Sequence, residues 1–211
     1  MTEQGVVEVE PGIRIHYTIR GSGEPALLVP NGSWVAGPLA PLARGRRVVG
    51  YDLRGRGRSS PVEDPSRLGA LRAGKVHRTD PRLYAREWMR HYLLPQQVAR
   101  KEHVDLVPLD ACDLPNEFPE SWIPGWLDAV YPSLGDWDWR PRLPELDVPV
   151  LLVWGETDRA APEAEQEWLG GLRRGALLVV PGSGHWPFCE NPGAFFPEVE
   201  RFLAGEPVAA P

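Results

Sequence analysis

The sequence of 211 residues predicts an α/β fold, with a mostly parallel sheet, helices on both of its faces and a helical lid. Continuous apolar runs at residues 26–29, 48–51, 148–154 and 176–180 are typical of strands that are covered on both faces. Helical patterns alternate with these runs, as expected for parallel strands joined by crossover helices. Polar side chains follow the last two runs, at the edge where such sheets bind their ligands.

The N-terminal residues predict a hairpin and then the first buried strand. Residues 13–20 alternate between apolar and polar side chains, after an apolar stretch at 6–9 and a Pro11-Gly12 turn. This alternation indicates a half-buried antiparallel hairpin. The apolar run at 26–29 stops at Pro30, which marks the end of its strand.

A short helix is expected over residues 38–43, before the strand at 48–51 that ends in Asp52. From Pro61 onward, proline, tryptophan and charged residues dominate, and no long apolar run returns before Val148. This middle third of the chain is therefore predicted to lie outside the sheet, as a lid.

Within the lid, aromatic side chains recur at every fourth position from Tyr84 and predict an amphipathic helix over residues 81–94. Asp80 and Pro81 provide its N-cap and a proline at the first helical position. Shorter helices are expected near residues 95–103 and 122–131.

The C-terminal third again alternates strands with helices. A helix over residues 162–172 separates the last two apolar runs, and its inward side is expected to carry Trp168, Leu169 and Leu172. The chain closes with a helix whose apolar face is formed by Phe195, Val199, Phe202 and Leu203.

Composition and charge exclude several classes of partner. The net charge is −6 and the basic residues are scattered among acids, which argues against nucleic acid or an anionic membrane, since binding phosphates needs clustered Lys and Arg. Cys112 and Cys189 are too few for a disulfide framework and lie in no metal-ligand spacing, so no metal and no cofactor are expected. The chain shows neither a leader pattern nor an apolar run near the roughly 20 residues of a membrane helix, which predicts a cytoplasmic protein.

Four segments together resemble the α/β-hydrolase superfamily, in particular its prolyl-iminopeptidase-like branch. They are residues 12–17 before the Gly21-Ser22-Gly23 turn, residues 27–34, residues 51–59, and the two loops Gly155-Glu156-Thr157-Asp158 and Gly182-Ser183-Gly184-His185-Trp186. The resemblance implies a hydrolase core formed by residues 1–68 and 147–211, with the lid or cap at 69–146 between its two parts.

The resemblance also implies roles for individual residues. An acid followed by a histidine is the order in which such a hydrolase completes its triad, so Asp158 would orient His185 as the catalytic base. The oxyanion loop would be formed by Asn31, Gly32, Ser33 and Trp34. Relatives hydrolyse small ester, amide or peptide bonds through an acyl-enzyme, so a small-molecule substrate or ligand is expected under the lid.

The nucleophile of that triad has no candidate, because the 211 residues contain no Gly-x-Ser-x-Gly elbow, nor the same elbow with Cys or Asp. In complete members, the loop that ends at Ser59 here is followed by the nucleophile strand, two helices and a further strand. The stretch between Ser60 and Pro81 is too short for these elements, since one strand-helix-strand unit needs about 30 residues. We interpret this as a deletion of the central nucleophile-bearing strand and its neighbour.

Without a nucleophile, a weakly active or inactive protein is expected, because an oxyanion hole and binding alone leave about 10³- to 10⁴-fold over water. Three alternatives stay open: an enzyme that uses His185 as base without a protein nucleophile, a non-catalytic ligand-binding or interaction protein, and a shortened chain without an evolved role. The deletion would also leave apolar strand edges, which favour a homo-oligomer.

Overall fold

The computed structural model describes residues 2–24, 26–30, 35, 37–52, 58–60, 89–109, 138–159 and 162–208. The chain divides into two compact units, Met1–His91 with Pro108–Gly135 and Tyr92–Val107 with Asp136–Pro211. The predicted lid at 69–146 is described only at its residues 89–109 and 138–146, so the predicted division into core and lid stays a prediction. No helix within the described residues has the length and apolar character needed to span a membrane.

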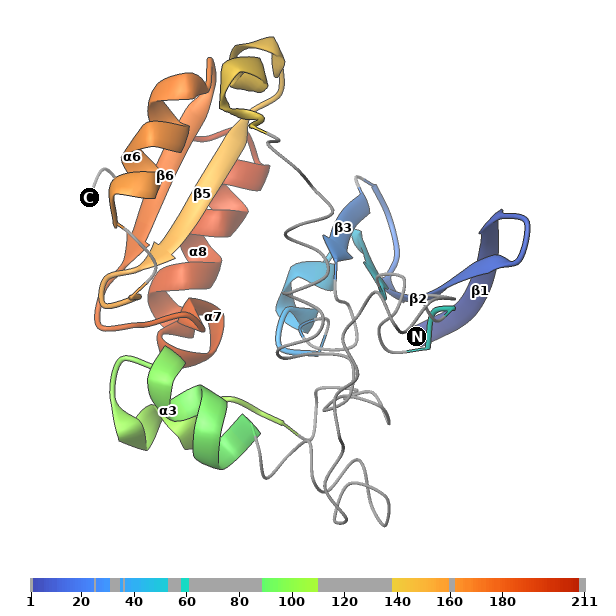
Figure 1. Ribbon diagram of the computed structural model, residues 1–211, viewed down its shortest axis with the longest axis horizontal. Helices are drawn as coiled ribbons and strands as arrows, with labels where there is room; N and C mark the ends of the chain where they lie inside the picture. Colours follow the sequence, from blue (N-terminus) through green and yellow to red (C-terminus); the bar gives the residue numbers. More distant parts are fainter. Residues whose placement is uncertain are drawn as a thin grey trace. The chain divides into compact units, whose positions relative to one another are not determined.

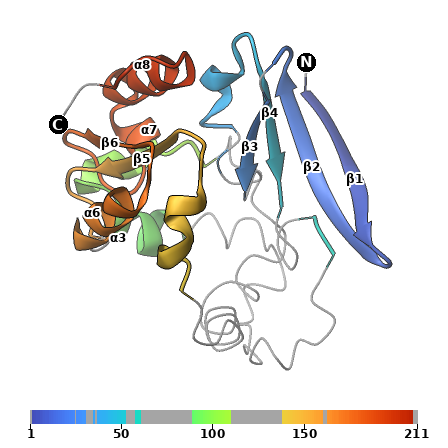
Figure 2. The ribbon, with the colours of Figure 1, turned by 90° about the horizontal axis from the view of Figure 1, so that it is seen from above.

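The first unit contains a four-stranded sheet in the order β1-β2-β4-β3, which Figure 2 shows from above. Strands β1 (Thr2–Glu10) and β2 (Ile13–Gly21) pair antiparallel, which confirms the predicted hairpin. Gly12 turns the chain between them with a φ of 80°, a conformation that favours glycine. Strand β4 (Arg47–Tyr51) pairs antiparallel with β2 and parallel with β3 (Ala26–Pro30).

The predicted strands at 26–29 and 48–51 are confirmed, but the burial expected of the first is wrong. Val48 in β4 is buried, and the predicted short helix is present as the 3-10 helix η1 (Ala40–Ala43), which buries Leu42. Among the described strands, β3 instead lies at one edge of the sheet, and the side chain of Leu28 is 71% exposed. An apolar run cannot distinguish a covered strand from an uncovered edge strand, because both contain the same residue types.

The second unit contains two parallel strands, β5 (Val150–Gly155) and β6 (Gly175–Val180), whose burial was predicted from their apolar runs. Helices α6 (Pro162–Gly171) and α8 (Pro192–Leu203) lie on opposite faces of this pair, as Figures 1 and 2 show. In this unit the described strands therefore have helices on both faces, as expected. Over all described strands, however, the pairing is mixed and not mostly parallel, because β2 pairs antiparallel with both of its neighbours.

The helices of the second unit follow the predicted pattern, apart from one side chain and one extra turn. Phe195 and Val199 of α8 are buried, and the Asn191 side chain accepts a hydrogen bond from the backbone N–H of Ala194, which caps the helix. Trp168 of α6 is 41% exposed, so its predicted inward orientation is wrong. The short helix α7 (Pro187–Glu190), just before α8, was not predicted.

The lid is described in part. Residues Met89–Leu93 form one π-helical turn, η4, and helix α3 (Leu94–Gln97) follows, with Pro95 in its first turn where a missing N–H is tolerated. The 3-10 helices η5 (Lys101–Leu106) and η6 (Arg140–Glu145) are further described turns. The predicted helix over 81–94 is described only from residue 89. The helix predicted over 122–131, and the stretch from 61 to 80 where the deletion is inferred, lie outside the described residues.

Candidate functional site

Asp158 and His185 lie together at the carboxyl ends of β5 and β6. Nδ1 of His185 is 2.9 Å from Oδ2 of Asp158, while the side chain of His185 is 53% exposed. With Nδ1 donating its proton to the carboxylate, a neutral ring carries its lone pair on Nε2, where it can accept a proton. The two side chains therefore have the relative geometry of the acid and histidine of a hydrolytic triad, and their catalytic role stays a prediction.

Hydrogen bonds between the two loops fix the distance between these side chains. Both the backbone N–H and the hydroxyl of Thr157 donate to the carbonyl oxygen of Ser183, at 2.9 and 3.0 Å. The N–H of Gly182 donates to a carboxylate oxygen of Glu156 at 2.7 Å. Because these bonds join the residues before Asp158 to the residues before His185, the two loops are held as one structure.

Two glycines permit the close approach of the chain segments around the pair. A Cβ atom added at Gly155 would overlap the carbonyl oxygens of Gly184 and Ser183. A Cβ at Gly184 would overlap the backbone of residues 97–99, which follow α3. Glycine is therefore required here by packing, and not by a left-handed backbone conformation.

A further acid lies beside the pair. Glu165, on α6, is buried. Burial raises the pKa of its carboxyl above the usual glutamate value, and the nearby negative charge of Asp158 raises it further. This residue was missed in the sequence, where it is one of several acids on a polar-looking helix, and only the fold brings it near Asp158.

The other predicted site residues lie outside the described residues. Strand β3 leads up to the predicted oxyanion loop, but Asn31, Gly32, Ser33 and Trp34 are not described, so their role stays a prediction. Two of the described serines use their hydroxyls in local structure: the Ser183 hydroxyl donates to the carbonyl of Val180, and the Ser59 hydroxyl to that of Asp52. None of the serines in the described part of the chain bonds to the ring of His185.

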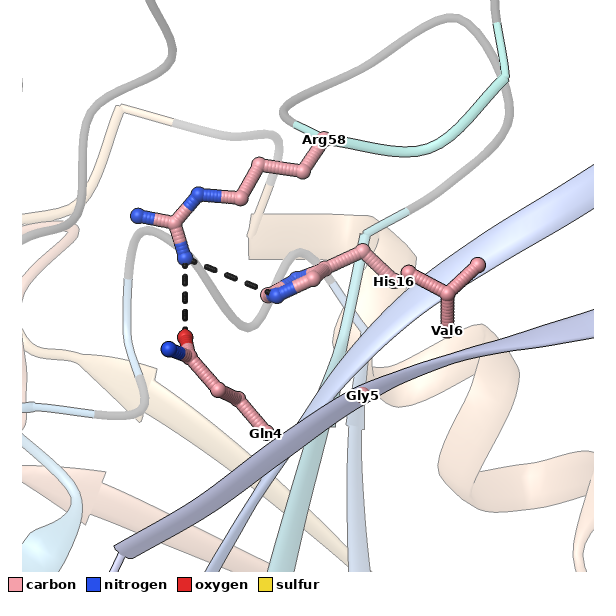
Figure 3. A pocket seen from close by; sticks show the side chains of 5 residues that line it. All are labelled: Gln4, Gly5, Val6, His16 and Arg58. Carbon is pink, nitrogen blue, oxygen red and sulfur yellow. Dashed lines mark hydrogen bonds between the residues drawn. The ribbon is translucent and has the colours of Figure 1, made fainter.

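A second histidine-aspartate pair, in the first unit, has a different surrounding. Nδ1 of His16 lies 3.3 Å from Oδ2 of Asp52, and both residues are buried. On the other side of the ring, Nη1 of Arg58 lies 3.5 Å from Nε2 and donates to Oε1 of Gln4 at 3.3 Å, as Figure 3 shows. Gln4, His16 and Arg58, with Gly5 and Val6, line a cavity of about 300 Å³.

The surroundings of Asp52 indicate a structural role for this second pair. The same oxygen of Asp52 that faces His16 accepts a hydrogen bond from the N–H of Arg58 at 3.1 Å, and the hydroxyl of Ser59 connects the carbonyl of Asp52 to the N–H of His16. Asp52 thus fixes the end of its loop. Nε2 of His16 faces a cation, whereas the ring of His185 is exposed.

Comparison with known proteins places these features in a family. A model of the alpha/beta hydrolase family matches residues 66–198. A 2-hydroxy-6-oxononadienedioate/2-hydroxy-6-oxononatrienedioate hydrolase from Klebsiella pneumoniae is 30% identical over 112 residues, which are 53% of this chain and 33% of that protein. The hydrolase of the same name from Escherichia coli strain K12 is 38% identical over 68 residues, 32% of this chain and 24% of that protein.

The matches therefore span about a third or less of the length of these curated relatives. They are hydrolases of oxo-dienedioates and not prolyl iminopeptidases, so they do not support the narrower resemblance to the iminopeptidase branch.

Solved structures are similar over nearly the whole chain. A thermophilic esterase from Thermogutta terrifontis superposes with a TM-score of 0.65 at 17% identity, covering 96% of this chain and 98% of that one. The serine hydrolase CarC, involved in carbazole degradation, gives 0.66 at 16%, covering 98% and 100%. The enol-lactonase from Burkholderia xenovorans gives 0.63 at 20%, covering 92% and 97%. At these identities the likeness shows a shared fold alone.

Proposed function

Because the chain belongs to the alpha/beta hydrolase family, we propose that it acts on a small carbonyl compound, with His185 as general base and Asp158 as the group that orients it. The observation that carries the proposal is the 2.9 Å contact between Nδ1 of His185 and Oδ2 of Asp158, with the ring half exposed. Esters, enol lactones and oxo acids are the substrate classes to examine, since similar proteins are described as acting on them.

In the proposed reaction, water takes the place of a protein nucleophile. Nε2 of His185 removes a proton from a water molecule as the water oxygen forms a bond to the carbonyl carbon. The imidazolium keeps its Nδ1 proton, which is hydrogen-bonded to Asp158. It then returns the Nε2 proton to the leaving atom, oxygen in an ester or lactone and carbon in an oxo acid, when the tetrahedral intermediate collapses. The new bond from the water oxygen to the carbonyl carbon is matched by the broken bond from that carbon to the leaving group. The proton taken from water ends on the leaving group.

The missing elbow motif favours this route over an acyl-enzyme. General base catalysis alone contributes typically 10²- to 10⁴-fold, so the turnover should be slow compared with that of a complete triad. The same observation favours the second candidate function, a protein that binds such a carbonyl compound without turning it over.

A covalent probe and one substitution test the proposal. The purified protein is treated with a fluorophosphonate and its intact mass is measured, and hydrolysis of a p-nitrophenyl ester and an enol lactone is followed for wild type and His185→Gln. We expect no adduct, and slow hydrolysis that His185→Gln removes. His91→Gln, a change at an exposed histidine outside the pair, serves as the control.

Each other outcome has a definite meaning. An adduct would identify a protein nucleophile and overturn the water route. Hydrolysis that is equal in wild type and His185→Gln would show that the pair is not catalytic. Substrate binding without turnover, measured by calorimetry, would establish the binding function instead.

A further inference from the structure

The backbone of the loop that carries His185 is hydrogen-bonded to a single buried carboxylate. Glu190 ends helix α7, and its side chain has no exposed surface. One of its oxygens, Oε1, accepts hydrogen bonds from the backbone N–H groups of Gly184 at 2.9 Å and Trp186 at 3.3 Å. These are the residues on either side of His185, so the carboxylate fixes the backbone before and after the base.

The second oxygen of the same carboxylate reaches a different part of the chain. Oε2 lies 2.7 Å from the backbone N of Ala99 and 2.8 Å from Nδ1 of His103. Both residues belong to the stretch that follows α3, and in sequence they lie 91 and 87 positions from Glu190. The carboxylate therefore connects this stretch of the lid to the loop that carries the base.

Gln97, at the end of α3, adds two bonds to this connection. Its backbone carbonyl accepts from the N–H of His185 at 2.8 Å, and its side-chain oxygen accepts from Nε1 of Trp186 at 3.0 Å. With Glu190, it gives all three backbone N–H groups from Gly184 to Trp186 a hydrogen-bond partner. The backbone of the base is thus attached to residues 97–103 as well as to its own strand.

We propose that Glu190 is a positioning residue for His185, and that residues 97–103 are the anchor through which it acts. The carboxylate holds the loop backbone in the position in which the His185 ring contacts Asp158. Its effect on catalysis rests on the proposed function, whereas its effect on the orientation of the ring does not.

The residue type fits this role. All four groups facing the carboxylate are donors when Nδ1 of His103 carries the proton, and a glutamate side chain offers oxygen acceptors only. Glutamine would keep an oxygen for Gly184 and Trp186 but would present an NH₂ group to Ala99 and His103. Glu190→Gln therefore loosens the anchor while it leaves the two bonds to the loop in place. Glu190→Ala removes both sets and leaves buried N–H groups without a partner, so it destabilises the fold more than Glu190→Gln does.

The test measures the ring of His185 directly. The protein is labelled with ¹⁵N-histidine, and the ring nitrogen shifts are recorded in alkaline buffer, where a free imidazole is neutral. The His185 signals are assigned by their loss in His185→Gln. In wild type we expect a protonated Nδ1 and an unprotonated Nε2. Glu190→Gln should move both shifts toward the average of the two tautomers, and Glu190→Ala, where it folds, should move them further.

Two controls accompany the measurement. Glu167→Gln makes the same chemical change at an exposed glutamate of α6 and should leave the shifts unchanged. His103→Leu removes the donor on the anchor side and should reproduce the effect of Glu190→Gln. Circular dichroism confirms that each variant is folded before its ring is examined.

Hydrolysis of the substrates named above gives the second reading. Glu190→Gln should lower kcat by up to about 10²-fold, the size of effect that a displacement of roughly 1 Å produces. It should change KM less than kcat. A folded Glu190→Gln with the wild-type ring shifts would overturn the positioning role, whatever the activity. Altered ring shifts in a protein whose wild type hydrolyses nothing would support the positioning role and contradict the proposed function.

Discussion

Asp158 and His185 leave two different strands, and a carboxylate oxygen of the first lies 2.9 Å from Nδ1 of the second. The contact follows from the register of the parallel strands, in which Gly155 at the end of β5 is level with Val180 at the end of β6. Asp158 and His185 follow these two residues within a few positions. The geometry of this pair is therefore set by the pairing of two short strands and by the bonds between their loops.

The first prediction concerns Asp158→Asn. An asparagine amide cannot accept a proton as a carboxylate does, and its NH₂ group would favour the ring tautomer with the proton on Nε2, which cannot act as a base. We expect the rate of hydrolysis to fall on the order of 10³-fold, but not below the rate of His185→Gln. The double variant should be no slower than either single variant, because the two residues act as a unit. Additive losses in the three kcat/KM values would contradict this.

The pair was predictable because each member follows an apolar run that could only be a strand. The order of acid and histidine along the chain added the expectation that the two side chains meet, and the structure confirms the contact. Glu190 could not be found in this way. Its partners Ala99 and His103 lie in the proline-rich middle third, where no periodicity indicates which residues return to the sheet.

Leu28 illustrates the other limit of sequence reasoning. Its apolar run correctly predicts strand β3, but the position of a strand in its sheet depends on partners elsewhere in the chain, and a strand does not specify its own neighbours. The expected burial was therefore wrong for Leu28 and correct for Val48, although both lie in similar runs. Trp168 is a comparable case, since its place on the inner or outer side of α6 depends on a small rotation of the helix.

A second prediction follows from the contact between Gly155 and the histidine loop. Gly155→Ala would place its Cβ against the backbone oxygens of Gly184 and Ser183, which cannot rotate away as a side chain can. We expect a loss of about 1–3 kcal/mol or more in the free energy of unfolding, measured by urea denaturation. The loops should also move apart, with loss of hydrolysis.

Gly170→Ala is the matched control for this substitution. Gly170 lies in α6, with no atom near the position of an added Cβ. The same change there should stabilise the protein by about 0.5–1 kcal/mol, because alanine favours the helix. If the two variants had equal stabilities, the close packing at Gly155 would be refuted.

The third prediction concerns self-association. Strand β3 lies at an edge of the sheet among the described residues, with Leu28 71% exposed, and such an edge favours pairing with a second copy of the chain. Leu28→Lys should shift the association measured by light scattering to concentrations at least about tenfold higher, since burying a leucine contributes roughly 1.5–3 kcal/mol. Val148→Lys changes an exposed apolar residue outside the strands and should have little effect. A wild type that is monomeric at every concentration would rule out the edge as an interface.

The last prediction uses the buried acid beside the pair. The pKa of Glu165 is raised in the folded protein, first by burial and then by the charge of Asp158, above the ordinary value of 4.5. Between 4.5 and the raised pKa, the folded state binds the proton more tightly than the unfolded state does. The free energy of unfolding therefore falls as the pH rises through this interval, and it does not recover at neutral pH.

Glu165→Gln removes this loss of stability, because an amide side chain does not ionise in this pH range. The variant should be more stable than wild type at pH 7, and the difference should shrink as the pH is lowered below about 4.5, where the glutamate of wild type is protonated in both states. Glu167→Gln, on the same helix but exposed and paired with Arg140, should show no such gain. Urea denaturation of the three proteins at pH 4 and pH 7 measures the difference. An equal gain for Glu165→Gln at both pH values would mean that side-chain shape, and not the buried charge, is what the substitution changes.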